Sequence, residues 1–144
     1  MNPESSAHSE QPFVSKDSTI TYAINQARTL ARLTIAEELQ QELWQVFRNN
    51  HCDDNYQPSA LQIAQRSLKN TALGYLMLLN TEQALAAAVD QFDHANNMTD
   101  VLAAFNVILN SGFGVEKQRV LKLFFHRWQH ESLVVNQWFM AQAL

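Results

Sequence analysis

The chain has 144 residues, a formal net charge of −4 at pH 7, 47% hydrophobic residues and only 3 Gly and 3 Pro. One domain is the expectation for this length, and the composition excludes a disordered chain and disfavours a turn-rich all-β fold. The acidic balance argues against nucleic acid and acidic membranes as partners. The single cysteine, Cys52, excludes an internal disulfide framework and fits a reducing compartment, so we expect a cytoplasmic protein.

The polar N-terminal segment, residues 1–17, lacks both the basic start and the apolar core of a secretory signal. We expect it to be a flexible lead-in to a helical domain at 18–144. The longest apolar run, Ala72–Leu79, is far shorter than the roughly 20 residues that a membrane-spanning helix needs. No membrane segment is therefore predicted.

Helical periodicity begins at Ser18, where apolar residues recur at steps of three and four: Ile20, Ile24, Ala27 and Ala31. Thr34 and Glu37 have the spacing of a capping box, which predicts that a second helix opens at Thr34. The apolar stripe of this second helix is expected to be buried: Ile35, Leu39, Leu43, Val46 and Phe47.

Turn-forming residues fill 49–58, and Ser59 with Gln62 then predicts a third capped helix. Its expected buried stripe runs along most of its length: Leu61, Ala64, Leu68, Ala72, Tyr75, Leu76 and Leu79. The second half of this helix is apolar nearly all round. Such a helix is covered on several sides, so we expect it in the middle of the domain.

Four further helices complete the pattern. Thr81 caps one that runs to about His94, and Asn97 caps the next, which ends near Gly112 in a left-handed stop. The last two are predicted from about Val115 to Gln129 and from Leu133 onward. They are expected to bury eight side chains: Leu121, Phe124, Phe125, Trp128, Val134, Val135, Trp138 and Phe139.

Seven helices with short connections predict an all-α fold of antiparallel helix pairs. A weak internal echo relates 75–80 to 105–110, because Tyr75 and Asn80 align with Phe105 and Asn110. Repeated helix pairs stack as an α-solenoid of armadillo or HEAT type, which is the fold we expect. A plain helix bundle is the alternative.

Few residues have the spacing that catalysis requires. His126 and His130 are four residues apart, but the residue after His126 is Arg127, whereas a zinc peptidase needs a glutamate there. His51 beside Cys52 is a poor nucleophile–base pair because adjacent residues rarely supply both groups. The small basic groups, such as Arg66 with Lys69, are typical of solvated helix faces. We predict no catalytic residue and no metal site in this chain.

Four stretches nevertheless resemble, in order and spacing, the C-terminal helical domain of bacterial M1 alanyl aminopeptidases (aminopeptidase N). The most specific is Phe92-Asp93-His94-Ala95-Asn96-Asn97-Met98-Thr99-Asp100. The others are Arg66-Ser67-Leu68-Lys69-Asn70, Phe125-His126-Arg127-Trp128, and Leu133-Val134 with Gln137-Trp138-Phe139. The resemblance covers roughly residues 19–144.

The resemblance implies a helical superhelix that packs over a catalytic domain and closes its active-site cavity. Members of this family are zinc-dependent and release residues from peptide N-termini. Their zinc ligands and general base lie upstream, and none of those motifs occurs in these residues. The resemblance therefore implies a chain without its own activity or cofactor, with zinc in the parent enzyme. Its partners would be the catalytic and N-terminal domains of that enzyme, with peptide substrates bound through the parent.

The resemblance also assigns site residues by position. Asn97 and Met98 correspond to residues that border the cavity, and Thr99 and Asp100 correspond to their supports. A flexible, polarizable methionine suits a pocket that accepts several side chains. Many members have arginine directly after the aspartate, and here that position is Val101, which puts any polar substrate contact from it in doubt.

A free-standing solenoid that binds another protein is the alternative function. It predicts polar terminal helices, whereas a domain of a larger enzyme predicts an exposed apolar patch where the missing domains pack. The last residues, Trp138–Leu144, are apolar for an outer cap. This composition favours docking onto another domain.

Overall fold

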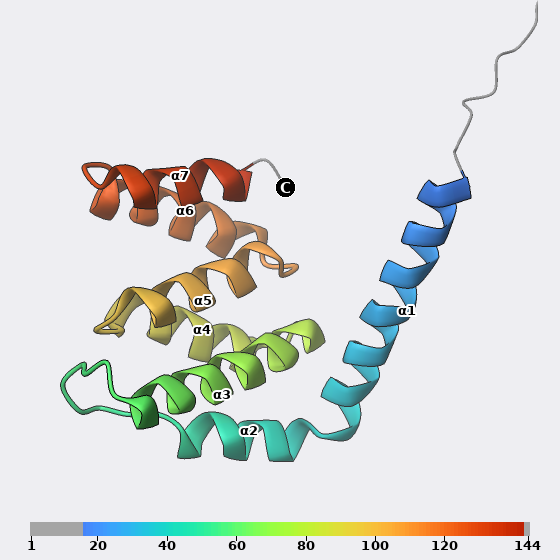
Figure 1. Cartoon of the computed structure of the whole chain (residues 1–144), viewed down its shortest axis with the longest axis horizontal. Helices are drawn as coiled ribbons and strands as arrows, with labels where there is room; N and C mark the ends of the chain where they lie inside the picture. Colours follow the sequence, from blue (N-terminus) through green and yellow to red (C-terminus); the bar gives the residue numbers. More distant parts are fainter. Residues whose placement is uncertain (1–15, 143–144) are drawn as a thin grey trace, which may run out of the picture. The chain divides into compact units, whose positions relative to one another are not determined.

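The computed structural model describes residues 16–142, and every element in that range is helical (Figure 1). The elements in chain order are α1 (Lys16–Glu38), α2 (Gln40–Asn49), α3 (Ala60–Leu76), the short 3-10 helix η1 (Met77–Leu79), α4 (Glu82–His94), α5 (Met98–Leu109), α6 (Gly114–Trp128) and α7 (Ser132–Gln142). The prediction of an all-α fold is confirmed.

The chain divides into two compact units, Met1–Ala31 and Arg32–Leu144. The described part of the first unit is helical throughout. The expected lead-in at 1–17 lies outside the described residues, except that Lys16 and Asp17 already belong to α1. The second unit holds the remaining helices and the hydrophobic core.

The predicted helix start at Thr34 is wrong. Thr34 lies inside α1, which continues to Glu38, and the break comes at Leu39 between α1 and α2. The amide of Leu39 still donates to Ile35 O at 2.9 Å, so the helical hydrogen bonding continues past Thr34 up to the break. A threonine and a glutamate three residues apart are compatible with a helix interior as well as with a cap, and the spacing alone does not distinguish the two.

Within the second unit, successive helices pair. α2 packs on α3, α4 on α5, and α6 on α7, while α3 also contacts α5 and α5 contacts α6. Figure 1 shows these three antiparallel pairs lying one above another. This is the arrangement of an armadillo or HEAT solenoid, as predicted. The internal echo has a structural basis, because it relates α3–η1 to α5, the corresponding helices of adjacent pairs.

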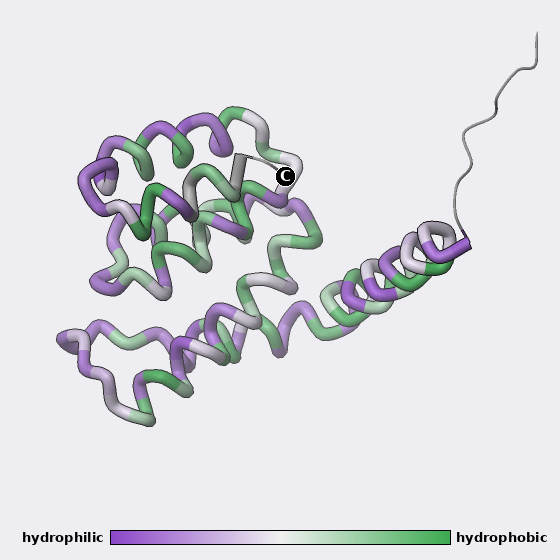
Figure 2. The backbone as a smooth tube through the Cα atoms, turned by 45° about the horizontal axis from the view of Figure 1, so that its top comes forward, coloured by the Kyte–Doolittle hydropathy of each residue, from purple (hydrophilic) through white to green (hydrophobic). Residues whose placement is uncertain are grey.

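Aromatic rings form the centre of the core. Phe92 of α4 stacks on Phe105 of α5 at 6.2 Å between centroids, and Phe105 stacks on Phe124 of α6 at 4.3 Å. Trp128 follows Phe124 at 4.7 Å. In Figure 2 hydrophobic and hydrophilic stretches alternate along these helices, as amphipathic helices require. One column of rings therefore joins three consecutive helices.

Some side chains predicted to be buried are exposed. Phe125 is 38% exposed and Phe139 is 59% exposed, whereas Val120 is fully buried and was not predicted. Val120 and Phe124 are four residues apart and share the face of α6 that enters the core, and Phe125 is rotated one residue away from it. The side chain of Trp138 lies outside the described residues.

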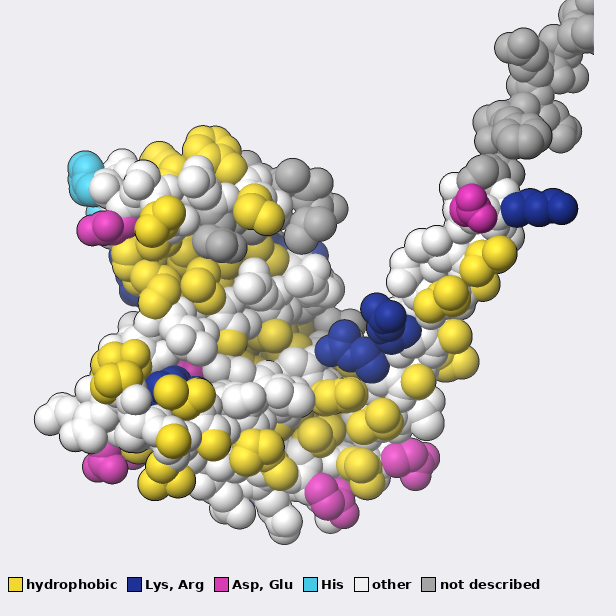
Figure 3. Space-filling view, in the orientation of Figure 1, with side chains coloured by type: hydrophobic (Ala, Val, Ile, Leu, Met, Phe, Trp, Pro, Cys, Tyr) yellow, Lys and Arg dark blue, Asp and Glu magenta, His cyan; other side chains and the backbone are white. Residues whose placement is uncertain are grey.

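The outer part of the predicted α3 stripe is also exposed. Leu61 is 69% exposed and Leu68 is 53% exposed, while Ala72, Leu73 and Leu76 are buried. Hydrophobic side chains are visible over α2 and α3 in Figure 3. Two residues predicted to be buried at the α1–α2 junction, Ile35 and Leu39, are exposed as well. The apolar stripe predicted from the sequence therefore included residues from two faces of α3, the face that packs in the core and a second apolar face that is exposed.

The predicted caps at three helix starts are confirmed. The side chains of Ser59, Thr81 and Asn97 accept from backbone amides three residues on, as N-caps do. The predicted left-handed stop at Gly112 is wrong, since no described glycine has a positive φ. Asn80 adopts that conformation instead, with φ 49°, and its Oδ1 accepts from Gly112 N at 2.9 Å.

Candidate functional site

A buried ion pair lies at the centre of the candidate site. Lys69 Nζ on α3 donates to Asp100 Oδ2 on α5 at 2.6 Å, and both residues are 4% exposed. Asn70 Nδ2 donates to the other carboxylate oxygen, Oδ1, at 2.7 Å. Lysine and aspartate are rarely buried unless they are paired, so this arrangement holds α3 and α5 in one register.

Two further amide side chains complete the polar network, which consists of Lys69, Asn70, Gln91, Asn97 and Asp100. Gln91 Nε2 on α4 donates to Asn70 Oδ1 at 2.8 Å and to the backbone oxygen of Asp100 at 2.9 Å. Asn97 Oδ1 accepts from Asp100 N at 2.9 Å, and Asn97 Nδ2 donates to Asp100 Oδ2 at 3.1 Å. The network therefore ties together α3, α4 and the first turn of α5.

The network keeps Asp100 ionised. Burial by itself raises the pKa of this carboxyl, because desolvation penalises the charge. Hydrogen bonds from Lys69, Asn70 and Asn97, together with the charge of Lys69, outweigh burial and hold the pKa of Asp100 below its ordinary value. The first turn of α5 thus carries a buried negative charge at the positive end of the helix dipole.

The four residues assigned by resemblance occupy different surroundings. Asn97 and Asp100 are joined within the polar network. Met98 is partly buried and packs against the edge of the hydrophobic core. Thr99 is exposed and lines a groove of about 570 Å³ between α3 and α5. The structure therefore brings Asn97 and Asp100 together and leaves Thr99 as the exposed member of the segment's helical turn.

The same groove contains groups from α3 and the preceding loop. The guanidinium of Arg66 lies 5.0 Å from the ring centroid of Tyr56, in a cation–π contact. The remaining lining residues are small, polar or aliphatic: Ile63, Ser67, Asn70, Thr71, Thr99 and Ala103. A surface of this kind offers hydrogen bonds and shape but no nucleophile–base pair.

Residues that carried the resemblance meet in the structure. Lys69 and Asn70 of one stretch contact Asp100 of another, 31 and 30 residues further on. Arg127 of a third stretch donates to Phe92 O at 3.3 Å and lies 3.7 Å from the carboxylate of Asp93. The motifs are therefore the polar contacts that join neighbouring helix pairs.

Sequence reasoning missed Lys69 and Gln91. Lys69 was interpreted as part of a solvated basic face, although it lies three and four residues before the buried Ala72 and Leu73. That spacing places Lys69 on the core face of α3, and it was the sequence signal that could have identified Lys69 as buried. Gln91 lies next to the buried Phe92, and nothing in its sequence context separates it from an exposed glutamine.

The structure adds no chemical role to the other residues considered above for catalysis or metal binding. His126 and His130 are exposed, and within residues 16–142 no group of three or more His, Cys, Asp or Glu side chains could hold a metal ion. Val101 is buried in the core, so it offers no polar group to a cavity. None of the described helices is both long and apolar enough to span a bilayer.

Comparisons with known proteins agree with this architecture. The sequence profile of a family described as a domain of unknown function with ARM repeats (DUF3458_C) matches residues 10–144. Aminopeptidase N of Haemophilus influenzae is 34% identical over 83% of this chain, and that of Escherichia coli is 31% identical over 84%. The chain spans only 13% and 14% of these two relatives.

A solved structure shows the same fold. Aminopeptidase A of Legionella pneumophila, determined in complex with aspartic acid, superposes with a TM-score of 0.70 and 25% identity. The match covers 94% of this chain and 16% of that one. Together with the repeat architecture and the family match, this confirms the expected resemblance: the chain belongs to the DUF3458_C family of ARM-repeat domains, the helical domain of M1 aminopeptidases.

Proposed function

We propose that this chain is the non-catalytic C-terminal domain of a zinc-dependent M1 aminopeptidase, which covers the active-site cavity and limits the access of peptides. Zinc and the catalytic groups belong to the catalytic domain of that parent enzyme. The domain contributes Asn97 and Met98 to the cavity wall, with Thr99 and Asp100 as their supports. We further propose that the parent is cytoplasmic, which cell fractionation with an antibody to this domain would test.

The observation that carries the proposal is the polar network. It fixes the first turn of α5 through five side chains from three helices, including the buried Lys69–Asp100 pair. An N-cap such as Asn97 satisfies one of the free amides at the start of a helix, and the network adds side-chain contacts from α3 and α4 to the same turn. A rigid turn is what a cavity wall needs, because loosely held contacts do not discriminate between substrates.

Exposed apolar side chains support docking onto other domains. Leu61, Ile63 and Leu68 on α3 are each more than half exposed, and Phe139 and Met140 on α7 are similarly open. Large apolar side chains exposed in this way are typical of interaction sites. The catalytic and N-terminal domains of the parent are the partners that we propose for these faces.

The first test is the native polypeptide that carries this sequence. We expect immunoblotting and intact mass spectrometry to find a product several times larger than 16.4 kDa, with bound zinc and aminopeptidase activity. The activity should release N-terminal residues from short peptides. A native product of 16.4 kDa without activity would contradict the proposal and favour a stand-alone interaction module.

The second test concerns the cavity wall. In the full-length enzyme, Met98→Ala should change the ratio of kcat/KM among substrates with different N-terminal side chains, because a flexible thioether is removed from the pocket. Lys122→Ala is the surface control, since Lys122 is exposed on α6 outside the proposed docking faces. Equal selectivity in the wild type, the variant and the control would show that Met98 does not line the pocket.

A further inference from the structure

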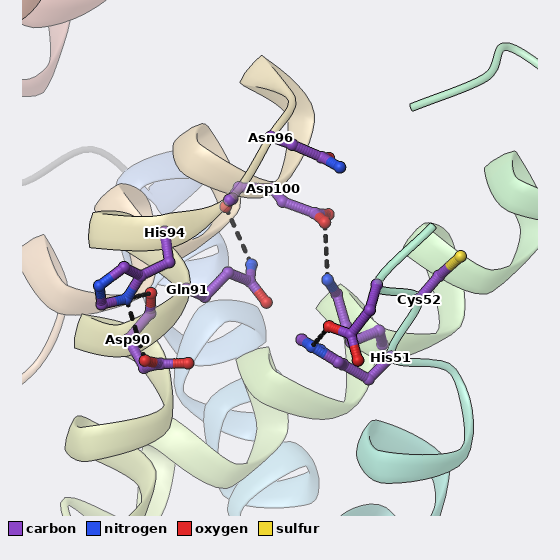
Figure 4. A pocket seen from close by; sticks show the side chains of 10 residues that line it. His51, Cys52, Asp90, Gln91, His94, Asn96 and Asp100 are labelled. Atoms are coloured by element: carbon purple, nitrogen blue, oxygen red, sulfur yellow. Dashed lines mark hydrogen bonds and ion pairs between the residues drawn. The ribbon is translucent and has the colours of Figure 1, made fainter. Parts of the chain in front are cut away.

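A second cavity borders the polar network. It has a volume of about 240 Å³ and is formed by the end of α4, the first turn of α5 and the segment after α2. Its inner wall is made by the buried residues Lys69, Gln91 and Asp100. Figure 4 shows Gln91 and Asp100 in this wall. Exposed side chains surround the opening: His51, Asp53, Asp90, His94 and Asn96.

Gln91 presents an unused acceptor to this cavity. The residue is 6% exposed, and its Oε1 has no hydrogen-bond partner. The amide cannot be rotated to exchange its two ends, because Nε2 already donates to two acceptors, Asn70 Oδ1 and the backbone oxygen of Asp100. In Figure 4 the oxygen points into the space between α4 and His51. A buried acceptor without a hydrogen-bond partner is unfavourable, so a donor group is expected beside it.

Lys69 presents unused donors to the same cavity. An ammonium carries three N–H groups, and the hydrogen bond to Asp100 uses one of them. A desolvated ammonium is poorly stabilised by a single partner, so a further acceptor is favoured beside Lys69 Nζ. The inner wall therefore offers a donor and an acceptor to the same small volume.

We propose that this cavity is a binding site for a primary carboxamide. The carbonyl oxygen of the ligand accepts from Lys69 Nζ, and its N–H donates to Gln91 Oε1. A primary carboxamide carries its oxygen and nitrogen on the same carbon and holds one N–H on the same side as the carbonyl oxygen, which matches one donor and one acceptor on a shared wall, whereas a trans peptide amide points the two groups in opposite directions. The site adjoins the cavity-wall segment of the proposed function through Asp100, and its test by binding to the 144-residue chain does not rest on that function.

The charges around the cavity favour a neutral ligand over an ionic one. A carboxylate would meet Asp53 and Asp90 at the opening and Asp100 inside, and a cation would meet the ammonium of Lys69. The charge of Lys69 is already balanced by Asp100 at 2.6 Å. The Cys52 sulfur points away from the cavity in Figure 4, with Asp54 as its partner, so a covalent adduct is not favoured.

Three small ligands of the same shape test the proposal on the 144-residue chain: acetamide, acetate and acetamidinium. Acetamide presents a donor and an acceptor, acetate presents acceptors only, and acetamidinium presents donors only. Their binding is measured by titration in ¹H–¹⁵N NMR spectra, with the Gln91 side-chain NH₂ and the Lys69 Nζ signals as reporters. We expect acetamide to shift both signals saturably and at lower concentration than either ion.

A pair of matched variants locates the binding. Ala95 lines the cavity without belonging to the polar network, whereas Ala86 is exposed on α4, the helix that ends just before Ala95. Ala95→Met fills the cavity and should weaken acetamide binding at least about tenfold, since the hydrogen bond to the charged Lys69 is lost. Ala86→Met should leave the affinity unchanged. Both variants keep Gln91 and Lys69, so the network and the reporters stay in place.

Three results would overturn the proposal. The first is equal shifts with all three ligands, which would indicate a non-specific solvent effect. The second is acetamide binding that Ala95→Met leaves intact. The third is a resident water that gives nuclear Overhauser contacts to the Gln91 amide and that acetamide does not displace. In that case the unused groups serve a buried water only.

Discussion

At the scale of single residues, the unusual feature is a lysine and an aspartate that are both buried. Lys69 and Asp100 are each 4% exposed in a domain whose other charged groups are mostly at the surface. Such a pair contributes little net stability, but removing one partner leaves a charge uncompensated in a poorly solvated place. The pair therefore serves to define which helices meet, and its two halves should respond very differently to single and double substitution.

We expect Lys69→Met to lower the free energy of unfolding by about 3–5 kcal/mol, because Asp100 loses its cation. Urea denaturation monitored by circular dichroism measures this. Lys122→Met is the matched control on the exposed face of α6 and should stay within about 0.5 kcal/mol of wild type. The double variant Lys69→Met/Asp100→Leu should recover part of the loss. A Lys69→Met variant as stable as the control would show that the pair is not buried.

The lowered pKa of Asp100 also predicts that the stability of the fold depends on pH. Its pKa is lower in the folded state than in the unfolded chain, where about 3.9 is usual. The stabilising contribution is complete above that unfolded value and is lost as the pH falls through the folded pKa. We expect the unfolding free energy of the wild type to fall more steeply between pH 5 and pH 2, about the usual acid range for carboxylates, than that of Asp100→Asn. Parallel curves for the two proteins would contradict the assignment.

At the scale of elements, the ends of helices link one pair to the next. The backbone N–H of Asn80 closes η1 by donating to Met77 O, and its side-chain Oδ1 accepts from Gly112 N in the turn before α6. Asn97 caps α5 and also contacts the carboxylate of Asp100. Each of these residues ends or begins a helix, and each also makes a second contact through its side chain. Their substitutions should therefore cost more than a local effect alone.

Substitutions of Asn80 separate the effect of its backbone conformation from the effect of its hydrogen bond, because its φ of 49° lies in the left-handed region. Asn80→Ala should cost about 1–2 kcal/mol for that conformation and about 0.5–1.5 kcal/mol for the lost hydrogen bond. Asn80→Gly loses only the hydrogen bond, since glycine adopts this conformation without strain. Thermal and urea unfolding of the two variants would measure the difference. Equal stabilities would show that position 80 is not strained.

At the scale of the whole molecule, the second unit is a short solenoid whose pairs share a column of aromatic rings. A solenoid of this length has two terminal faces, and here apolar side chains such as Leu61 and Leu68 remain exposed. Terminal repeats that stand alone present a polar outer face. The chain matches less than a fifth of the length of each aminopeptidase it was compared with, which leaves ample chain in such proteins to cover these faces.

Leu68→Gln tests, in two settings, whether the exposed apolar face of α3 docks onto another domain. In the 144-residue chain we expect a change in unfolding free energy within about 0.5 kcal/mol, because the side chain is 53% exposed. In the full-length enzyme the same change should lower the melting temperature and increase proteolysis of this domain. Lys122→Gln on α6 is the surface control in both proteins. A silent Leu68→Gln in the full-length enzyme would show that this face does not dock.

Much of the fold could be predicted from local sequence patterns. The helices, their pairing and three N-caps follow from apolar periodicity and from capping residues such as Ser59 and Asn97, which act over three or four residues. The errors fall where local patterns are ambiguous. Thr34 has cap spacing within a helix interior, and Gly112 was predicted as a left-handed stop because glycine adopts that region easily, although no described glycine has a positive φ.

For the site, the sequence by itself determined Asn97 as a cap, and the resemblance singled out the segment that follows it. The tertiary structure decided the rest: that Lys69 is buried, that it meets Asp100, and that the Gln91 oxygen faces a cavity. These facts depend on helices brought together from positions up to 31 residues apart. Periodicity describes one helix at a time, so it specifies which face is apolar, but the contacts between faces are set by packing in three dimensions.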